Sequence, residues 1–464
     1  MITRIEIDGF KTLHDVAIDI APFQAFTGAC GAGLSNLFDA IAFLGSLAES
    51  DLRSAFDGGR GEPEEFFTLG AEGAHGNRMR LAVEMLVSPR VEDRWGVRAD
   101  VKYTRMRYEI DVERLAEARG PDRLSITHEA LLPIQRTGDG WARRHLARTR
   151  ERWLPALRTG RTVPFISTDN AGRAGTVFLH QDGRGGDMAA PAHGGQRTVL
   201  STIAGTEFPH AYAAREEMRS WRTIMLNPVS IRGGGQPHAH TFIGFDGGNL
   251  TAALARMKGQ DAAMPARLAR DLGQIVPDVA EIELDERGGF YRQRVRVAMG
   301  NGLFLPLPLL SDSVLRLLVL AALKNDPDGG GVLALDEPEN GHDAATLRRL
   351  APFLLGMGTC LADPDAAPVL RQVIVATRSS GLVYELARIL TERSDAPVHD
   401  LPELLYAWRE ETPYEANGAS APVGGGTRFM PVRPSQQLAL DLEDGSGREE
   451  MITLVEIEQA LAQW

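Results

Sequence analysis

The chain has 464 residues, 43% of them hydrophobic and 24% charged, with a formal net charge of −12. This length allows two or three domains with sizeable cores, and the composition is that of an ordinary globular protein. No apolar run is long enough to span a membrane, and the start MITRIEIDGF lacks the features of a secretory signal. The cysteines Cys30 and Cys360 are too few for a disulfide framework or a metal cluster, so we expect a cytoplasmic protein. Because the net charge is negative, nucleic acid would need a local basic patch.

The N-terminal stretch predicts a nucleotide-binding loop. Apolar runs at Ile2 to Ile7 and Val16 to Phe26 predict strands, and Asn36 to Leu47 predicts a helix. Between the second strand and the helix lies the glycine-rich stretch TGACGAGLSN, in the setting where backbone N–H groups surround a phosphate. Its spacing is that of a phosphate-binding loop, but Leu34 stands where the motif has Lys. The predicted nucleotide-binding residues are Gly28, Ala29, Cys30, Gly31, Ala32, Gly33, Leu34, Ser35 and Asn36. Cys30 is interpreted as a small filler, with a redox sensor as the alternative.

The next part of the chain predicts antiparallel strands followed by a basic segment. Met79 to Leu86, Val101 to Val112 and Arg123 to Leu131 read as strands with one wet face. Residues 137 to 162 are rich in arginine, with Trp141 and Trp153 among the basic residues. Such a segment could follow a nucleic-acid backbone, or it could be a solvated helix in an Arg-rich protein. The arginines are Arg143, Arg144, Arg148, Arg150, Arg152, Arg158 and Arg161.

Helices and a hairpin are expected before the second apolar core. Ala211 to Leu226, Leu250 to Met257 and Met264 to Ile275 predict helices, and Ile282 to Leu284 and Tyr291 to Ala298 predict a hairpin. Between the first two of these helices, His238 and His240 could pair on a metal, but no third ligand is apparent in the sequence.

Two acids at the end of an apolar strand predict the magnesium end of the site. The stretch GVLALDEPEN, residues 331–340, is a buried strand that ends in Asp336 and Glu337. Carboxylates at such a strand end suit Mg²⁺, with Asp336 holding the ion through water and Glu337 polarising the attacking water. Ser35 would be the second metal ligand. Upstream, Ser311, Asp312 and Ser313 open a helix that runs to Leu323 and either bind an anion or cap the helix.

These motifs, in this order, resemble the ABC-type heads of the RecF/SMC class, and within it the small bacterial AAA-family ATPases without long coiled coils. The resemblance covers residues 1–48 and 300–390 by motif and the middle only by layout. It implies an α/β P-loop NTPase with a mixed sheet, an antiparallel β subdomain and an inserted helical arm. It further implies ATP and Mg²⁺ as ligands, and a homodimer in which one subunit's signature, here residues 311–313, closes over the other subunit's nucleotide.

The chain departs from this family at positions that carry chemistry. Leu34 replaces the loop Lys, Ser313 stands where the signature has Gly, and Arg378 replaces the switch His after the strand that ends in Ala-Thr. Two interpretations remain open. One is a retained fold with little or no turnover, and the other is an active ATPase in which Arg378 or Lys11 substitutes for the missing cation, so Glu337 and Arg378 are the catalytic candidates.

The predicted organisation is a two-lobed head. Residues 1–135 form an N-terminal lobe, 136–275 an inserted arm or lid, 276–415 a C-terminal lobe and 416–464 a flexible linker with a terminal helix. One predicted function is a DNA-associated ATPase or ATP-switched clamp in genome maintenance or defence against mobile DNA. The other is a weakened head that scaffolds or regulates an effector protein such as a nuclease.

Overall fold

The structure, a computed structural model, describes residues 1–70, 73–115, 122–156, 161–169, 176–180, 188–191, 195–233, 242–285, 294–363, 369–393, 401–410, 425–433 and 452–462. Arg158, His238, His240 and residues 416–424 and 434–451 of the predicted linker and terminal region lie outside this part of the chain.

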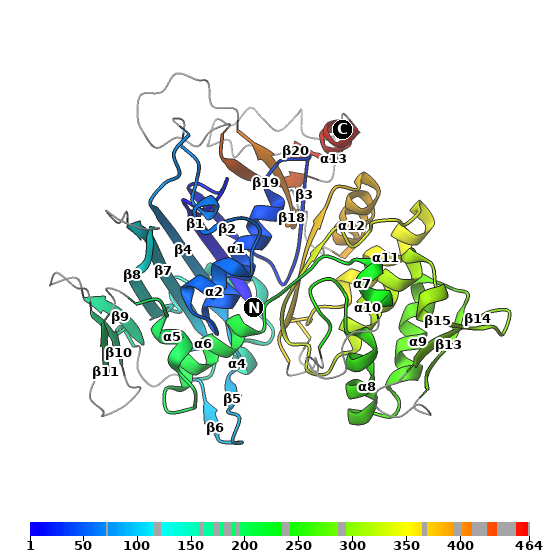
Figure 1. Ribbon diagram of the computed structural model, residues 1–464, viewed down its shortest axis with the longest axis horizontal. Helices are drawn as coiled ribbons and strands as arrows, with labels where there is room; N and C mark the ends of the chain where they lie inside the picture. Colours follow the sequence, from blue (N-terminus) through cyan, green and yellow to red (C-terminus); the bar gives the residue numbers. More distant parts are fainter. Residues whose placement is uncertain are drawn as a thin grey trace.

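An eight-stranded antiparallel sheet forms one side of the molecule (Figure 1). Its strand order is β11-β10-β9-β8-β7-β4-β1-β2. Along β7, buried residues alternate with partly exposed ones, which confirms the predicted strands with one wet face. The strands are β1 Ile2–Asp8, β2 Val16–Asp19, β4 Arg78–Leu86, β7 Arg105–Leu115, β8 Arg123–Pro133, β9 Ile166–Asp169, β10 Thr176–Leu179 and β11 Met188–Pro191.

A second, seven-stranded sheet runs through the centre in the order β12-β16-β17-β3-β18-β19-β20. The first five strands in this order pair in parallel, so their carboxyl ends meet at one edge. Thr27 of β3 lies opposite Thr377 of β17, and Asp336 of β16 lies opposite Ala376. The loop after β3 and the acids Asp336 and Glu337 at the end of β16 therefore lie at the same edge of the sheet, with β17 between the two strands. The strands are β3 Phe23–Gly28, β12 Arg222–Ile224, β16 Gly331–Asp336, β17 Arg371–Thr377, β18 Leu401–Arg409, β19 Thr427–Arg433 and β20 Ile452–Thr453.

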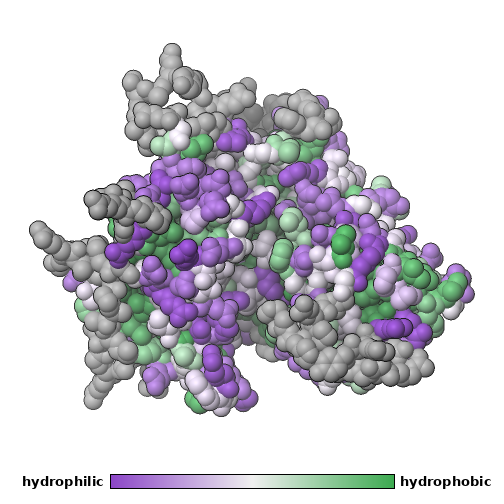
Figure 2. All heavy atoms as spheres, in the orientation of Figure 1, coloured by the Kyte–Doolittle hydropathy of each residue, from purple (hydrophilic) through white to green (hydrophobic). Residues whose placement is uncertain are grey.

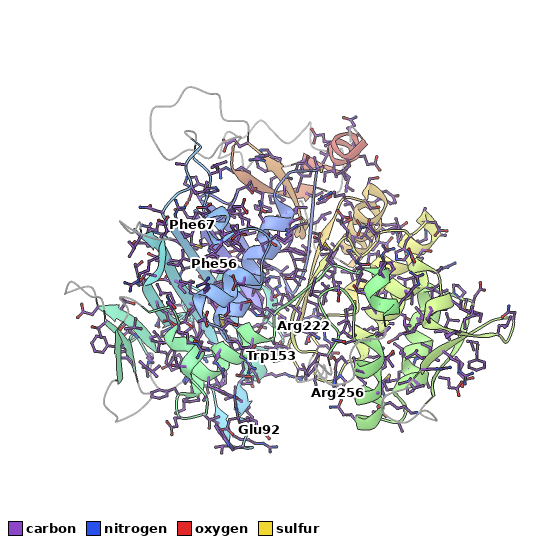
Figure 3. All side chains as sticks on the ribbon, viewed as in Figure 1. Phe56, Phe67, Glu92, Trp153, Arg222 and Arg256 are labelled. Atoms are coloured by element: carbon purple, nitrogen blue, oxygen red, sulfur yellow. The ribbon has the colours of Figure 1, made fainter. Side chains whose placement is uncertain are left out.

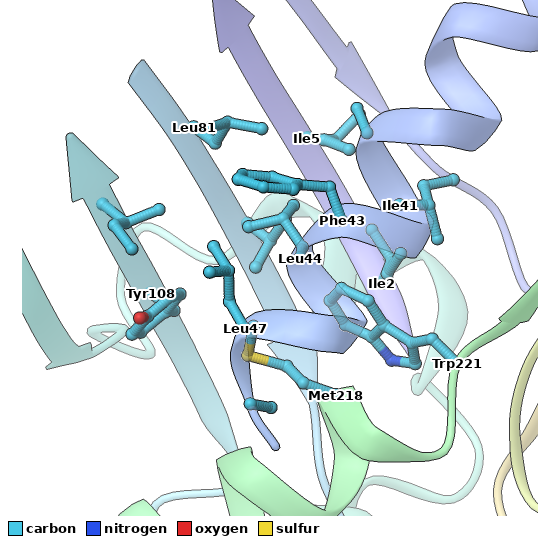
Figure 4. Close-up of a cluster of buried hydrophobic side chains, with 14 of the residues drawn as sticks. Ile2, Ile5, Ile41, Phe43, Leu44, Leu47, Leu81, Tyr108, Met218 and Trp221 are labelled. Carbon is cyan, nitrogen blue, oxygen red and sulfur yellow. The ribbon is translucent and has the colours of Figure 1, made fainter. Parts of the chain in front are cut away.

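The central sheet is buried on both faces. Along β17, Ile374 and Ala376 belong to the core shared with α1 and the antiparallel sheet, whereas Val373 and Val375 belong to the core on the opposite face. Helix α1, residues Leu34–Leu47, thus lies between the two sheets, and Figure 4 shows its side chains Phe43 and Leu44 within the first core. This double burial explains the near-continuous apolar runs of the central strands.

Helices flank the central sheet on both faces. On the side of the antiparallel sheet, α2 Leu52–Asp57, α5 Val199–Thr202 and α6 Pro209–Arg219 pack with α1 in the core between the two sheets. The short helices α3 Gly140–His145 and α4 Arg150–Trp153 belong to a separate small core. On the other side lie α7 Pro228–Arg232, α8 Leu250–Gln260, α9 Met264–Ile275, α10 Asp312–Asn325, α11 Ala344–Leu355 and α12 Ser380–Arg393. The remaining elements are the hairpin β5 Arg90–Glu92 and β6 Arg98–Asp100, the sheet β13 Val279–Asp285, β14 Arg294–Met299 and β15 Phe304–Pro306, the short 3₁₀ helices Pro63–Phe66 and Leu307–Leu309, and α13 Leu454–Ala462.

Three local predictions need correction. The strand expected over Val16 to Phe26 is two strands, β2 in the antiparallel sheet and β3 in the central sheet. The helix expected over Ala211 to Leu226 ends at Arg219, because Arg222–Ile224 are extended and pair with β16. The predicted linker and terminal region also contains β19, which pairs with β18 and extends the central sheet. Pairing with distant strands overrode local preference in the second and third cases. The basic segment, for which a solvated helix was one alternative, forms the two short helices α3 and α4.

The surface in Figure 2 is mostly hydrophilic, with hydrophobic residues in small separate groups. In the described part of the chain, no helix has the length and apolarity that crossing a membrane requires.

Candidate nucleotide-binding site

The loop between β3 and α1 has two positions where a side chain cannot fit. A Cβ on Gly28 would lie 2.4 Å from the carbonyl oxygen of Ala407, and a Cβ on Gly33 would lie 2.1 Å from Oγ1 of Thr427. Gly33 also has a φ of 93°, which favours glycine. Contacts with β18 at Gly28 and with β19 at Gly33 thus require glycine at both ends of this loop.

The first turn of α1 is open to a ligand. Its N-cap, Gly33, provides no side-chain hydrogen bond, and the N–H groups of Leu34 and Ser35 have no acceptor among the described residues. At the tip of the loop, a Cβ on Gly31 would have no described atom within 4 Å. Free N–H groups at a helix N-terminus attract anions, so the cradle fits a phosphate.

Leu34 is part of the hydrophobic core. Its side chain is only 6% exposed and packs in the core between α1 and the antiparallel sheet. Ser35 and Asn36 are partly exposed, and Asn36 donates to Oγ1 of Thr12 at 2.8 Å. Position 34 therefore stabilises the fold and supplies no charge to the loop.

The acids after β16 lie at the same edge of the sheet. The Asp336 carboxylate is partly buried, and burial together with the neighbouring Glu337 raises its pKa. Glu337 has a φ of 48°, and its N–H donates to the carbonyl of Ala376 at 2.9 Å. Hydroxyl and carboxylate oxygens are ligands that Mg²⁺ accepts, so Ser35 and Asp336 fit the predicted metal-binding role.

Arg378 bridges the acidic strand end and the loop. Its Nε lies 3.2 Å from Oε1 of Glu337, and its Nη1 lies 3.9 Å from the sulfur of Cys30. Asn340 donates to the other carboxylate oxygen of Glu337 at 2.7 Å. The guanidinium thus lies beside the candidate phosphate site and also forms an ion pair with Glu337, the carboxylate predicted to polarise water.

A buried acid fixes the backbone that carries Arg378. The carboxylate of Glu339 accepts hydrogen bonds from the hydroxyl of Thr377 and, at 3.3 Å, from the backbone N–H of Arg378. Burial raises the pKa of Glu339, and its second oxygen has no partner among the described residues.

The structure adds Arg60, which the sequence analysis did not single out. This side chain donates to the backbone carbonyl of Ser35 at 3.1 Å and to both oxygens of Asp39 at 3.0 Å. Its positive charge also lowers the pKa of Asp336, against the stronger effect of burial. Because Arg60 lies in a loop and reaches α1 only through folding, its sequence neighbours carry no signal of this role.

Lys11, the other proposed substitute cation, is already engaged. Its Nζ donates to Asp39 at 2.7 Å and to the carbonyl of Arg60 at 2.9 Å, and lies 4.5 Å from the ring centre of Phe66. Phe56 and Phe67, labelled in Figure 3, belong to the aromatic cluster beneath this loop. Lys11 therefore holds Asp39 and the loop of Arg60 in place.

A cavity of about 440 Å³ runs along α1 from this site. Asp39, Arg60 and Asp336 line one part of it, and Trp221 and Phe245 are among its apolar lining residues. The site is therefore continuous with a groove between α1 and β12.

The signature residues are held by contacts within their own chain. Ser311 caps α10 by accepting from the N–H of Val314 at 3.3 Å, and Asp312 pairs with Arg232 at 2.6 Å. Ser313 Oγ lies 2.6 Å from Nδ1 of His342, whose pKa burial lowers to about 4. His342 is therefore neutral at physiological pH, and Ser313 is tied to the loop that follows Glu337.

The basic segment divides into exposed and committed arginines. The side chain of Arg161 donates to the carbonyls of Val163 and Pro164, and Arg152 lies over the ring of Trp153. Trp153 is itself only 1% exposed, so this indole does not offer a stacking surface. The exposed arginines are Arg143, Arg144, Arg148 and Arg150.

A phosphate-type loop and an acidic strand end that meet at one edge of a central, largely parallel sheet define a P-loop NTPase head. Among solved structures, the chain is similar to an SMC head bound to the C-winged helix domain of ScpA, with a TM-score of 0.51 and 10% identity over 93% of this chain and 98% of that one. The chain therefore has the fold of an ABC/SMC-like P-loop ATPase head.

Other comparisons are more distant or partial. An SMC head domain from Thermotoga maritima shares 12% identity over 93% of this chain and 99% of its own, at a TM-score of 0.36. Residues 196–383 match a protein family described as AAA domain, putative AbiEii toxin, Type IV TA system. No curated protein matches the chain.

Proposed function

We propose that the chain is a Mg²⁺- and ATP-binding head that works as a nucleotide-dependent switch with slow hydrolysis. The observation that carries this proposal is the position of Arg378, between the Glu337 carboxylate and the loop residue Cys30. A guanidinium there can hold a phosphate oxygen, because Arg is a strong donor to phosphates. Bound ATP and Mg²⁺ would supply the scissile phosphate and the charge that balances it.

Two arginines would replace the missing loop Lys. Arg60 is fixed against α1 by Asp39 and Ser35, and Arg378 approaches from the end of β17. Arg60 brings positive charge to the first turn of α1 and Arg378 brings it to the loop at Cys30, which supports nucleotide binding. Slow turnover follows because Glu337 is occupied by Arg378 and Asn340 and is not free to orient water.

We also propose that two chains associate with the signature of one facing the nucleotide of the other. Ser311 and Asp312 lie at the N-terminus of α10, which is the part of a helix that favours an anion. Ser313 would have to release His342 in order to donate to a phosphate of the partner's nucleotide. This requirement is a second reason to expect slow hydrolysis.

DNA is the proposed partner of the exposed arginines on α3, on α4 and between them. The setting proposed for this switch is defence against mobile DNA, and the match of residues 196–383 to a family described as a putative AbiEii toxin supports it. The alternative is a scaffold that controls a separate effector protein. The buried Leu34 and the occupied Glu337 favour that alternative, because both features reduce hydrolysis and a scaffold does not need it.

An ATP titration by calorimetry tests the nucleotide proposal. The full chain with Mg²⁺ should bind ATP, and Asp336→Ala should bind it more weakly because a metal-binding carboxylate is removed. Asp328→Ala, which changes an exposed acid away from this edge of the sheet, is the matched control. Equal ATP affinity in the wild type and Asp336→Ala would contradict the proposed metal-dependent mode.

A further inference from the structure

A cavity of about 250 Å³ lies within the basic segment, away from the nucleotide loop. Arg136, Arg143 and Arg150 line it, together with Asp139 and the apolar side chain of Leu154. Three arginines thus line one small concave site.

The single acid in this cavity is already neutralised. Asp139 is almost fully buried and pairs with the equally buried Arg105, with 2.8 Å between its Oδ2 and Nε of the arginine. Its other oxygen accepts from the N–H of Ala142 and caps α3. The described residues provide no carboxylate partner for Arg136, Arg143 or Arg150, so the cavity keeps an uncompensated positive charge.

The walls of the cavity are anchored in the fold. Trp153, labelled in Figure 3, is buried at the end of α4, and its carbonyl accepts from the hydroxyl of Thr104 at 2.6 Å. Thr149 donates to the carbonyl of Leu361, and Arg136 donates to the carbonyl of Pro155. The backbone that carries these arginines is thus held in place, which lowers the reorganisation that binding a ligand would need.

Like charges face each other inside the cavity. Burial lowers the pKa of Arg136, and the nearby charge of Arg150 lowers it further. Cations held together without a counter-ion repel each other, and an anion between them would relieve that repulsion. Arg binds phosphate oxygens through paired hydrogen bonds, so phosphate is the anion that best matches several guanidinium groups.

We propose that this cavity binds a terminal phosphate monoester of a nucleic-acid strand. A monoester carries nearly two negative charges at neutral pH, whereas each internal backbone phosphate carries one. An end group can enter a small cavity, while an internal phosphate is flanked by a sugar on each side. The proposal rests on the DNA-binding role proposed above for the exposed arginines, and it adds that the preferred substrate is a phosphorylated strand end.

The test compares a short DNA duplex with phosphates on all of its ends and the same duplex with hydroxyl ends, bound to the full-length chain at fixed salt. We expect the phosphorylated duplex to bind about tenfold or more tightly, the effect of one added charged hydrogen-bonding group. Arg150→Gln, which changes an exposed side chain, should remove this difference. Arg148→Gln, on the same segment but outside the cavity, should weaken both duplexes and keep the ratio. An unchanged ratio in Arg150→Gln would overturn the proposal.

A second titration, with inorganic phosphate, separates the cavity from the DNA-binding proposal. Binding that disappears in Arg150→Gln but persists in Asp336→Ala would place the phosphate in this cavity and not in the nucleotide loop. If phosphate binds in that way but neither duplex binds, a small phosphorylated molecule is the ligand and both the strand-end and the DNA-binding proposals fail. If both duplexes bind equally and phosphate does not bind, the DNA-binding proposal stands and the cavity proposal fails.

Discussion

Replacing Leu34 with Lys restores the residue that phosphate-binding loops carry at this position, and the structure predicts two opposite effects. In the free protein, Leu34→Lys places an ammonium group where a side chain is only 6% exposed. Full burial of a leucine contributes about 1.5–3 kcal/mol, and an unpaired buried charge costs more. We therefore expect the melting temperature of the free variant to fall, whereas Leu34→Met, which conserves volume, should change it little.

With ATP and Mg²⁺, the new ammonium group can turn toward the phosphates. The variant should then bind ATP more tightly than the wild type, and a saturating ligand should recover stability, by about 2.7 kcal/mol at a hundredfold excess over Kd. One electrostatic interaction of this kind commonly contributes about 10²–10³ in rate. We expect a much smaller gain, below about tenfold, because catalytic groups act as a unit. Arg378 still occupies Glu337 at 3.2 Å, and Ser313 still bonds His342.

Steady-state phosphate release measures the outcome, with Leu34→Met as the control for core repacking. A hundredfold rise in kcat from Leu34→Lys alone would show that Arg378 and Ser313 do not limit hydrolysis. The slow-switch account would then have to be dropped.

Three further predictions address other parts of the molecule. Arg378→Gln should weaken ATP binding about tenfold in calorimetry, because a charged donor is removed. Arg388→Gln, on the exposed face of α12, should leave the ATP affinity unchanged. Equal losses of ATP affinity in the two variants would argue against a contact between Arg378 and a phosphate. Neutralising Arg143, Arg144, Arg148 and Arg150 should flatten the dependence of DNA affinity on salt concentration, by up to about one unit of log–log slope for each arginine that pairs with a backbone phosphate. Arg90→Gln in the exposed hairpin should leave this slope unchanged. An unchanged slope in the fourfold variant would exclude this segment as the DNA-binding surface. Burial raises the pKa of Glu129 from 4.5 to about 7, so the folded state holds this proton more tightly than the unfolded state and the free energy of unfolding falls as pH rises from about 4.5 to 7. Glu129→Gln should therefore melt at a higher temperature than the wild type above pH 7 and lose that advantage at low pH. A pH-independent difference in melting temperature would be inconsistent with this titration.

Local patterns allowed the main elements of the site to be predicted. The glycine loop, the apolar strand ending in Asp336 and the capped helix at Ser311 each have a signal within about ten residues of sequence. The structure contains all three, and the parallel pairing of β3, β17 and β16 brings the glycine loop and the strand end at Asp336 to the same edge of the sheet.

The interactions that shape the loop could not be predicted, because their partners are distant in the sequence. Gly33 is confined by Thr427, whose strand β19 lay in a region read as a linker. Arg60 reaches Ser35 only because α2 and the following loop fold back over α1. The burial of Leu34 likewise depends on the antiparallel sheet that covers this end of the helix.

An ATP titration of the wild-type chain with and without Mg²⁺, in the same calorimetric experiment, tests the proposed nucleotide-dependent switch most directly. We expect saturable binding with Mg²⁺ that becomes clearly weaker when the metal is removed, since Ser35 and Asp336 are the proposed ligands of an ion that would contact the nucleotide. A wild-type chain that binds no ATP in the presence of Mg²⁺ would contradict the proposal that this head is a nucleotide-dependent switch.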